Sequence, residues 1–465
     1  MIVIRLAIVF VPLFILLIGP WPVDNTHFQK TDYAIQTQQY IKSITRNKNE
    51  SPLKAGSAEV EITPIPGSPL AGYSARDPKE NTGAIDKIYA KAISIANNNT
   101  NITLLSAEIL LPLHELVDAV VLKTGLKRNE IYFTATHTHS GPGGYAHGIV
   151  EKASMGDFSQ TQFDMLVDAL SSAVLKSRSN MQPVELRYSR LQLTPEYAHQ
   201  FIHNQLFDGA KSHNSIHVLE LINTNTFSHL ATLLTFSAHP TFLGRLNRKI
   251  SGDYPNALMR ELKMKLGGTT MFSVGAVGSM LPTGDGLHNV KTVKNELRQM
   301  NDAAKTLADF ISTSLKNNAS IDKNKLIKIS SWKEKNTTIQ SEIVPVLLPY
   351  PNYRITDNLR LSPFLVNSIF HDNDTFIHAI KIGKLFFLSY PADYSGELAA
   401  SLEKWGDQNN AYPWATSFNG EYLGYIMPSE HYDMDHYVTR DVNFFGRWAG
   451  DYFEELSKEI ISSLK

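Results

Sequence analysis

The stretch "NEIYFTATHTHSGPGGY" (residues 129–145) decides how this chain is read. Its first half is rich in β-forming residues and predicts a strand. Alternate residues of a strand face the same side, so His137 and His139 project together where the strand ends. The glycines and proline after them predict a turn through which backbone can approach a ligand closely. The pair is a candidate metal site, although most such pairs are ordinary surface or core histidines.

Composition narrows the chemistry that such a site can use. The 465 residues are 43% hydrophobic and 19% charged, which is typical of a globular protein. The formal net charge of -1 gives no electrostatic case for binding nucleic acid. The chain has no cysteine, which excludes disulfides, thiolate zinc sites and a cysteine nucleophile. Any metal must therefore be held by histidine, carboxylate or another oxygen ligand.

Strand and helix patterns are mixed along the whole chain. Segments such as "YAKAISIA", "ITLLSAEIL" and "HLATLLTFSAH" predict strands, and apolar spacing predicts helices over 161–176, 290–316 and 446–463. There is no repeat and no low-complexity linker. We therefore expect an α/β fold, with a single large domain of mixed β-sheets flanked by helices over residues 55–465. The apolar, proline-rich stretch 341–370 is either a surface loop or an apolar wall beside a site.

The N-terminus has a different character. Residues 6–23 carry no charge and Arg5 precedes them, so residues 1–23 are expected to be a signal peptide or a membrane anchor. Arg5 on the short flank favours export of the rest of the chain, either secreted or anchored on the periplasmic or extracellular face. Residues 24–54 are polar and are expected to form an irregular lead-in.

Other predicted strands also end in polar residues. His239 follows "LLTFSA", and Asp393 follows "FFLSYPA". Both residues are candidate metal ligands. The alternative for His239 is a hydrogen-bonded core histidine, and the alternative for Asp393 is a cap on the next helix. The pattern "SGDYP" also predicts that Asp253 caps the helix that follows it. Histidines and a carboxylate without cysteine suit one zinc ion per chain, with an open position for water.

The run "THTHSGPGG" (residues 136–144) resembles the signature of the neutral, non-lysosomal ceramidases and their bacterial relatives. Further stretches on both sides of this run occur in the same order as in that family. They are "AGYSARD", "FSAHPTFLG", "SGDYPNALMREL", "VGAVGSM", "YPADYSGEL" and "GYIMPSEHYDMDHY". The resemblance covers about residues 55–460. The immunoglobulin-like C-terminal domain of the larger ceramidases is expected to be missing.

The resemblance implies a catalytic zinc ion and roles for particular residues. Tyr437 would donate a hydrogen bond to the developing oxyanion, and His139 would handle protons. The zinc ligands of the family map onto His137, His239, Asp393 and Tyr425.

The chain departs from the family at three positions. Asp393 stands where the family usually has glutamate, and Asn204 stands where an arginine is expected. Gly278 occupies the position of a proposed serine, with Ser279 one place later. A zinc–water mechanism tolerates these changes better than a serine nucleophile does. Four residues are candidates for contact with the substrate or for support of the metal ligands. They are Asn204, Asp253, Gly278 and Ser279.

The expected function is zinc-dependent hydrolysis of the N-acyl amide bond of ceramide or a related lipid amide, which releases a fatty acid and a sphingoid base. The expected partners are this lipid substrate and, through the N-terminus, a membrane. Two alternatives stay open. One is a zinc amidase or esterase that acts on a different exported substrate, and the other is a catalytically silent, membrane-anchored binding protein.

Overall fold

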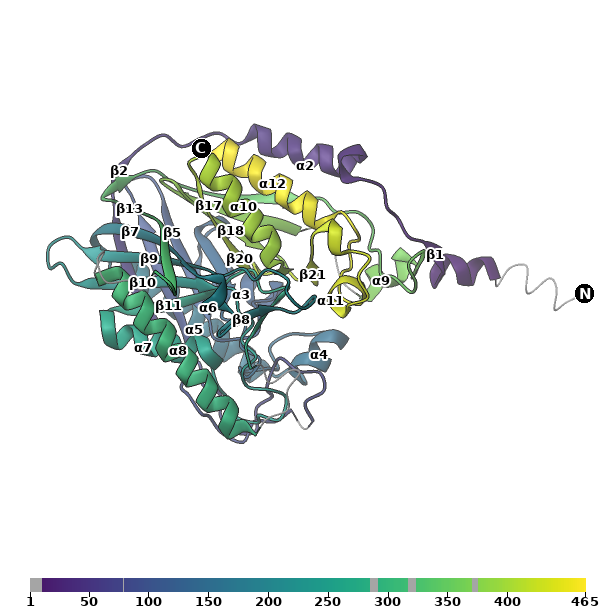
Figure 1. Cartoon of the computed structure of the whole chain (residues 1–465), viewed down its shortest axis with the longest axis horizontal. Coiled ribbons are helices and arrows are strands. Elements are labelled where there is room, and N and C mark those ends of the chain that lie inside the picture. The colour runs from purple at the N-terminus through teal and green to yellow at the C-terminus, as the bar shows by residue number, and fades with distance from the viewer. Residues whose placement is uncertain (1–10, 78, 285–291, 317–322, 370–374) are drawn as a thin grey trace, which may run out of the picture.

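A computed structural model describes residues 11–77, 79–284, 292–316, 323–369 and 375–465 (Figure 1). Its largest sheet has nine strands, in the order β11-β10-β9-β7-β3-β4-β5-β6 with β13 paired to β7. The pairs β5–β6 and β10–β11 are parallel, and the other pairs are antiparallel. The strands are β3 (Lys54–Glu61), β4 (Tyr89–Ala96), β5 (Asn101–Ala107), β6 (Ile131–Ala135), β7 (Gln182–Leu193), β9 (Ser215–Asn223), β10 (His229–Phe236), β11 (Thr269–Val274) and β13 (Leu326–Glu334).

A second sheet has four strands, in the order β15-β17-β18-β20. Alternate residues of its strands point to opposite faces, as the period of a strand requires. Phe387 belongs to the core shared with the large sheet, whereas Phe386 and Leu388 belong to the core under the helices on the other face. The strands are β15 (Ile339–Val346), β17 (Thr375–Ile382), β18 (Leu385–Tyr390) and β20 (Tyr412–Ser417).

Helices cover the outer faces of the two sheets (Figure 1). On the large sheet, α5 packs on β3, β4 and β5, and α7 packs on β11 and against α8. On the small sheet, α2 lies beside α12, and α10 packs on β20. The helices are α2 (Asp32–Ser43), α3 (His114–Thr124), α5 (Gln160–Ser179), α7 (Asp253–Leu266), α8 (Val293–Lys316), α10 (Gly396–Gln408) and α12 (Ala449–Leu464).

Short elements complete the described chain. Four separate two-stranded sheets pair β1 with β16, β2 with β14, β8 with β12 and β19 with β21. Their bounds are β1 (Trp21–Pro22), β16 (Leu359–Arg360), β2 (Ser51–Pro52), β14 (Asn336–Thr337), β8 (Ile202–Asn204), β12 (Met280–Pro282), β19 (Asp393–Tyr394) and β21 (Tyr425–Ile426). The short helices are α4 (Ile149–Met155), α6 (Pro195–Ala198), α9 (Pro363–Ile369) and α11 (Tyr437–Arg440). Three 3-10 turns are η1 (Phe28–Lys30), η2 (Arg128–Glu130) and η3 (Ser429–His431).

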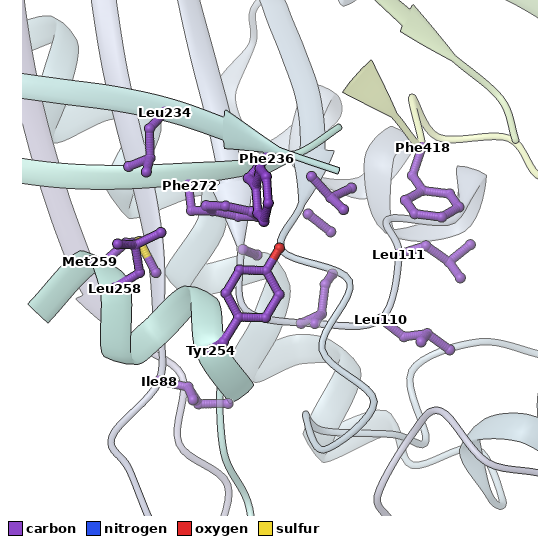
Figure 2. Packing of buried hydrophobic residues seen from close by; sticks show 14 of the residues in the cluster. Ile88, Leu110, Leu111, Leu234, Phe236, Tyr254, Leu258, Met259, Phe272 and Phe418 are labelled. Atoms are coloured by element: carbon purple, nitrogen blue, oxygen red, sulfur yellow. The ribbon is translucent and has the colours of Figure 1, made fainter. Parts of the chain in front are cut away.

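The large sheet curls, so that strands distant in its order meet. Thr134 Oγ1 on β6 lies 2.9 Å from Ser273 Oγ on β11. Apolar packing supports this closure: Figure 2 shows the Tyr254 ring projecting from α7 toward Phe236 of β10 and Phe272 of β11. The Tyr254 hydroxyl donates a 2.6 Å hydrogen bond to the Ala238 carbonyl. The ends of β6 and β10 are thereby held in one region.

The mixed α/β fold agrees with the prediction, and α5, α8 and α12 begin and end within a few residues of the predicted helices. The predicted lead-in is wrong in one respect, because residues 24–54 are not irregular throughout. Helix α2 lies within them and buries Ala34, Thr37 and Ile41. These residues recur at helical spacing in a stretch whose overall polarity hid the pattern.

The N-terminal hydrophobic segment predicted over residues 1–23 lies partly outside the described residues. From residue 11 onward, residues 11–17 are helical and exposed. Over the described ranges, no helix combines the length and the apolar character that a membrane span requires.

Candidate metal centre

Three histidine side chains converge where β6 and β10 end. The Nε2 atom of His239 lies 2.9 Å from that of His137 and 3.0 Å from that of His139, and the latter two are 3.3 Å apart. Tetrahedral zinc binds histidine nitrogen at about 2.0–2.1 Å, which separates two such nitrogens by roughly 3.3 Å. The three histidines could therefore hold a metal ion.

His137 is held with its Nε2 atom toward the cluster. Its Nδ1 lies 2.8 Å from the Leu110 carbonyl oxygen, which can only accept, so Nδ1 carries the proton and Nε2 keeps its lone pair. The backbone of His137 has a φ of 62°, which is uncommon for a residue other than glycine. Burial and the nearby His239 hold the pKa of His137 well below its usual value. The His137 ring is therefore neutral at physiological pH and could bind a metal ion.

His139 and His239 are also kept neutral. Burial lowers the pKa of His239 to about 4. Burial, the two other histidines and the Arg76 guanidinium lower the pKa of His139 well below its usual value. Arg76 donates a 2.8 Å hydrogen bond to the His139 carbonyl. Gly72 makes this close packing sterically feasible, because a Cβ atom there would lie 2.5 Å from His139 Cα.

Asp393 approaches the histidines from β19. Its Oδ1 lies 3.7 Å from His137 Nε2 and has no hydrogen-bond partner, although the residue is buried. Its Oδ2 accepts a 2.9 Å hydrogen bond from the Tyr422 hydroxyl. Burial raises the pKa of Asp393 to about 7. A buried carboxylate oxygen without a partner is costly unless a cation binds it, so Asp393 fits the same metal site.

Tyr425 lies directly opposite Asp393, because the two are register partners in the parallel pair β19–β21. Burial, followed by the charge of Asp393, raises the pKa of Tyr425 well above its usual value. Its ring lies 6.1 Å from that of Tyr437. Both tyrosines line the pocket in front of the histidines, so the structure brings the predicted ligands and the predicted oxyanion donor to one place.

Gln205 is a residue of the site that the sequence analysis missed. Tyr437 donates a 2.9 Å hydrogen bond to Gln205 Oε1, and Gln205 Nε2 donates a 3.0 Å bond to the Gly278 carbonyl. Gln205 follows the Asn204 position, but spacing alone could not connect it to Tyr437, because 232 positions separate them. The contact of Tyr422 with Asp393 likewise had no signal in the sequence.

Asn204 and Ser279 face Glu397 rather than the histidines. The Asn204 amide donates to Glu397 Oε1, and the Ser279 hydroxyl donates to Glu397 Oε2. Gly278 lets this loop approach β19, because a Cβ atom there would lie 2.4 Å from the Asp393 carbonyl oxygen. These three residues support the backbone that presents Asp393.

Asp253 is the first residue of α7 and lies behind the site. Its Oδ2 accepts a 2.9 Å hydrogen bond from the Leu243 amide, and burial raises its pKa to about 7. Because Leu243 follows His239 in the same loop, Asp253 holds that loop against the start of α7.

A pocket with a volume of about 470 Å³ opens in front of the histidines. This volume is in the usual range for small-molecule sites. No residue of the stretch 341–370 lines it among the described residues, so that stretch is not an apolar wall of this pocket. The lining consists of Gly72, Tyr73, Ser74, Ala75, His139, His239, Thr241, Arg245, Leu281, Tyr425 and Tyr437.

Residues 54–271 match the family model of the neutral/alkaline non-lysosomal ceramidase, N-terminal. The predicted resemblance to the neutral ceramidases is confirmed. The three converging histidines lie inside this match, whereas Asp393, Tyr425 and Tyr437 lie beyond it.

Curated neutral ceramidases match shorter segments. The neutral ceramidase of Oryza sativa subsp. japonica is 24% identical over 142 residues, which cover 29% of this chain and 18% of that protein. The neutral ceramidase of Pseudomonas aeruginosa is 28% identical over 134 residues, which cover 27% of this chain and 19% of that protein. The matched segments thus span only about a fifth of these relatives.

Solved structures match far more of the chain. The crystal structure of the neutral ceramidase from Pseudomonas aeruginosa aligns with a TM-score of 0.69 at 16% identity, over 89% of this chain and 75% of that chain. A structure of a ceramidase complexed with C2 aligns with the same values. The similarity shows that most of this chain shares the fold of these structures.

Proposed function

We propose that this chain is a zinc-dependent hydrolase that cleaves the N-acyl amide bond of ceramide or a related lipid amide, with release of a fatty acid and a sphingoid base. The convergence of three neutral histidine nitrogens, no more than 3.3 Å apart, carries the proposal. The ceramidase family match over residues 54–271 supports the substrate class.

Zinc is the proposed ion because nitrogen and carboxylate ligands without thiolate suit it. We assign His137, His239, Asp393 and Tyr425 as its ligands. Zinc at this position would lower the pKa of water and polarise a carbonyl group. His137 and Asp393 are suited to hold it, because one presents a lone pair from a fixed ring and the other a buried oxygen without a hydrogen bond.

His139 is the proposed proton carrier. It lines the pocket, whereas His137 does not, so His139 is the accessible one of the pair. Its depressed pKa leaves the ring neutral and able to accept the proton of the attacking water. The same ring would return that proton to the leaving amine.

Tyr437 is the proposed donor to the oxyanion that forms when water adds to the amide carbonyl. Its hydroxyl reaches Gln205 and lies on the pocket wall. One donor of this type is worth roughly 3 kcal/mol of transition-state stabilisation. Export of the chain is also proposed, because residues 6–23 carry no charge and Arg5 precedes them.

The proposal is tested by measuring metal content and hydrolysis on the same purified samples. We expect about one zinc ion per chain and cleavage of N-acylsphingosine. The His137→Ala variant should lose both, whereas the control His199→Ala changes an exposed histidine remote in sequence and should keep both. Full hydrolysis by a metal-free His137→Ala variant would contradict the proposal. Parallel assays with an N-acyl amino acid and a simple ester compare the substrate classes.

A further inference from the structure

The pocket in front of the histidines contains an uncompensated positive charge. Arg245 lies in the loop between β10 and α7 and lines this pocket, and it is exposed. Among the described lining residues there is no aspartate or glutamate, and Arg245 is the sole lysine or arginine. The pocket therefore presents one fixed cation and no fixed anion to a ligand.

The neighbouring cations are already occupied by backbone oxygens. Arg76 is buried and donates to the carbonyls of Ala71 and His139 at 2.9 and 2.8 Å. Lys79 donates to the carbonyls of Tyr73 and Ser74 at 3.0 and 3.2 Å. By contrast, the Arg245 guanidinium makes no hydrogen bond or ion pair with any side chain or carbonyl of the described chain. Arg245 is thus the cation at this site that is available to a ligand.

We propose that the preferred substrate is a lipid amide with an anionic group, such as a carboxylate, on the amine side of the scissile bond. This inference rests on the proposed function. Arginine presents a planar fork of donors that matches carboxylate and phosphate oxygens. The acyl chain is apolar and gains nothing from a guanidinium, so the anion belongs to the amine portion. Arg245 is then a specificity-determining residue of the pocket.

The test compares two substrates with the same acyl chain. N-lauroylglycine carries a carboxylate next to the amide, and N-lauroylethanolamine carries a neutral hydroxyl. For the natural chain we expect a higher kcat/KM for N-lauroylglycine. In Arg245→Gln this kcat/KM should fall roughly 10-fold, mainly through KM, as expected for a charged hydrogen bond at an exposed site. The kcat/KM for N-lauroylethanolamine should change less than about twofold.

Two further variants sharpen the comparison. Arg245→Lys keeps the charge and should recover part of the preference for N-lauroylglycine. The control Lys249→Gln removes an exposed cation that does not line the pocket, so this preference should stay unchanged. Raising the salt concentration should reduce the preference of the natural chain, because salt screens exposed charges. N-lauroylethanolamine phosphate extends the comparison to a second anion, which should show the same dependence on Arg245.

The outcomes separate this inference from the proposed function. If both substrates are cleaved and Arg245→Gln leaves their ratio unchanged, the inference is overturned while the proposed hydrolase remains. Preferential cleavage of N-lauroylethanolamine by the natural chain would overturn it as well. If the zinc-loaded natural chain cleaves none of these amides nor N-acylsphingosine, the proposed function itself fails.

Discussion

The Nε2 atoms of His137 and His239 lie 2.9 Å apart, although 102 positions separate the two residues. The curl of the large sheet produces this approach, because it brings the end of β6 to the end of β10. The Leu110 carbonyl orients the His137 ring so that its lone pair points at His239. Two buried nitrogens this close need a cation or a shared proton between them, which makes the pair the centre of the proposed metal site.

The first prediction concerns His139. We expect the His139→Gln variant to keep about one zinc ion per chain while kcat falls by roughly 10² to 10⁴, because a general base is lost and the assigned ligands remain. Elemental analysis and steady-state kinetics on the same sample measure the two quantities. Because His139 Nε2 lies as close to the cluster as the other two nitrogens, loss of zinc in this variant would reassign His139 as a ligand.

The second prediction concerns Tyr437 and the residue that orients it. Tyr437→Phe should lower kcat by roughly 10² to 10³ with zinc retained, because one oxyanion donor is removed. Gln205→Ala keeps the phenol but removes its 2.9 Å partner, so a smaller loss of about 10-fold is expected. Tyr350→Phe, at an exposed tyrosine, is the control. Equal activity of Tyr437→Phe and the natural chain would exclude this role.

The third prediction concerns Ser279, which is fully buried and donates to Glu397 while its oxygen accepts from the Gly396 amide. We expect Ser279→Ala to keep kcat within about threefold, because this hydroxyl is committed to the scaffold. The free energy of unfolding should fall by about 1–3 kcal/mol, since the buried Gly396 amide loses its acceptor and the half-buried Glu397 carboxylate loses a donor.

Ser395→Ala is the matched control for that variant, because Ser395 donates to the same oxygen of Glu397. Denaturant unfolding and kinetics on both variants check the result. Complete loss of activity in Ser279→Ala alone, with zinc and stability preserved, would restore the serine as a nucleophile.

The fourth prediction is a pH dependence of stability that arises from Glu108. Burial raises the pKa of this carboxyl from an ordinary value of 4.5 to about 7, although Lys91 and a hydrogen bond from Asn256 act in the opposite direction. The native state then retains a proton that the unfolded chain loses near pH 4.5. The contribution of Glu108 to stability is therefore greatest below pH 4.5, falls as the pH rises to about 7 and is constant above it.

Glu108→Gln removes this titration. The free energy of unfolding of the natural chain should thus fall more between pH 4.5 and 7 than that of the variant, by roughly 3 kcal/mol. Urea unfolding at a series of pH values measures the difference, with Glu50→Gln at an exposed position as the control. Parallel pH profiles of the natural chain and Glu108→Gln would show that burial does not shift this carboxyl.

Much of the candidate site could be predicted because strand ends are local features. His137 and His139 converge as predicted, but β6 ends at Ala135 and His137 has a φ of 62°, so the period of a strand is not the reason. The proline after His239 marked the end of its strand. The contacts of Asp393 with Tyr422, and of Tyr437 with Gln205, could not be predicted, because each joins segments whose separation along the chain carries no information about their approach. Helix α2 was missed because its buried stripe is narrow and its remaining residues are polar.

The sequence by itself determined which chemistry is available. Without cysteine, any metal must be bound by nitrogen and oxygen ligands, and the strand patterns placed those ligands at the ends of buried segments. Only the tertiary structure decided which of them meet. The curl of the large sheet joined His137 to His239, and the parallel pair β19–β21 set Asp393 beside Tyr425. Ser279, which is adjacent to the expected nucleophile position, instead donates to the half-buried Glu397, because the loop packs against α10 rather than opening to the pocket.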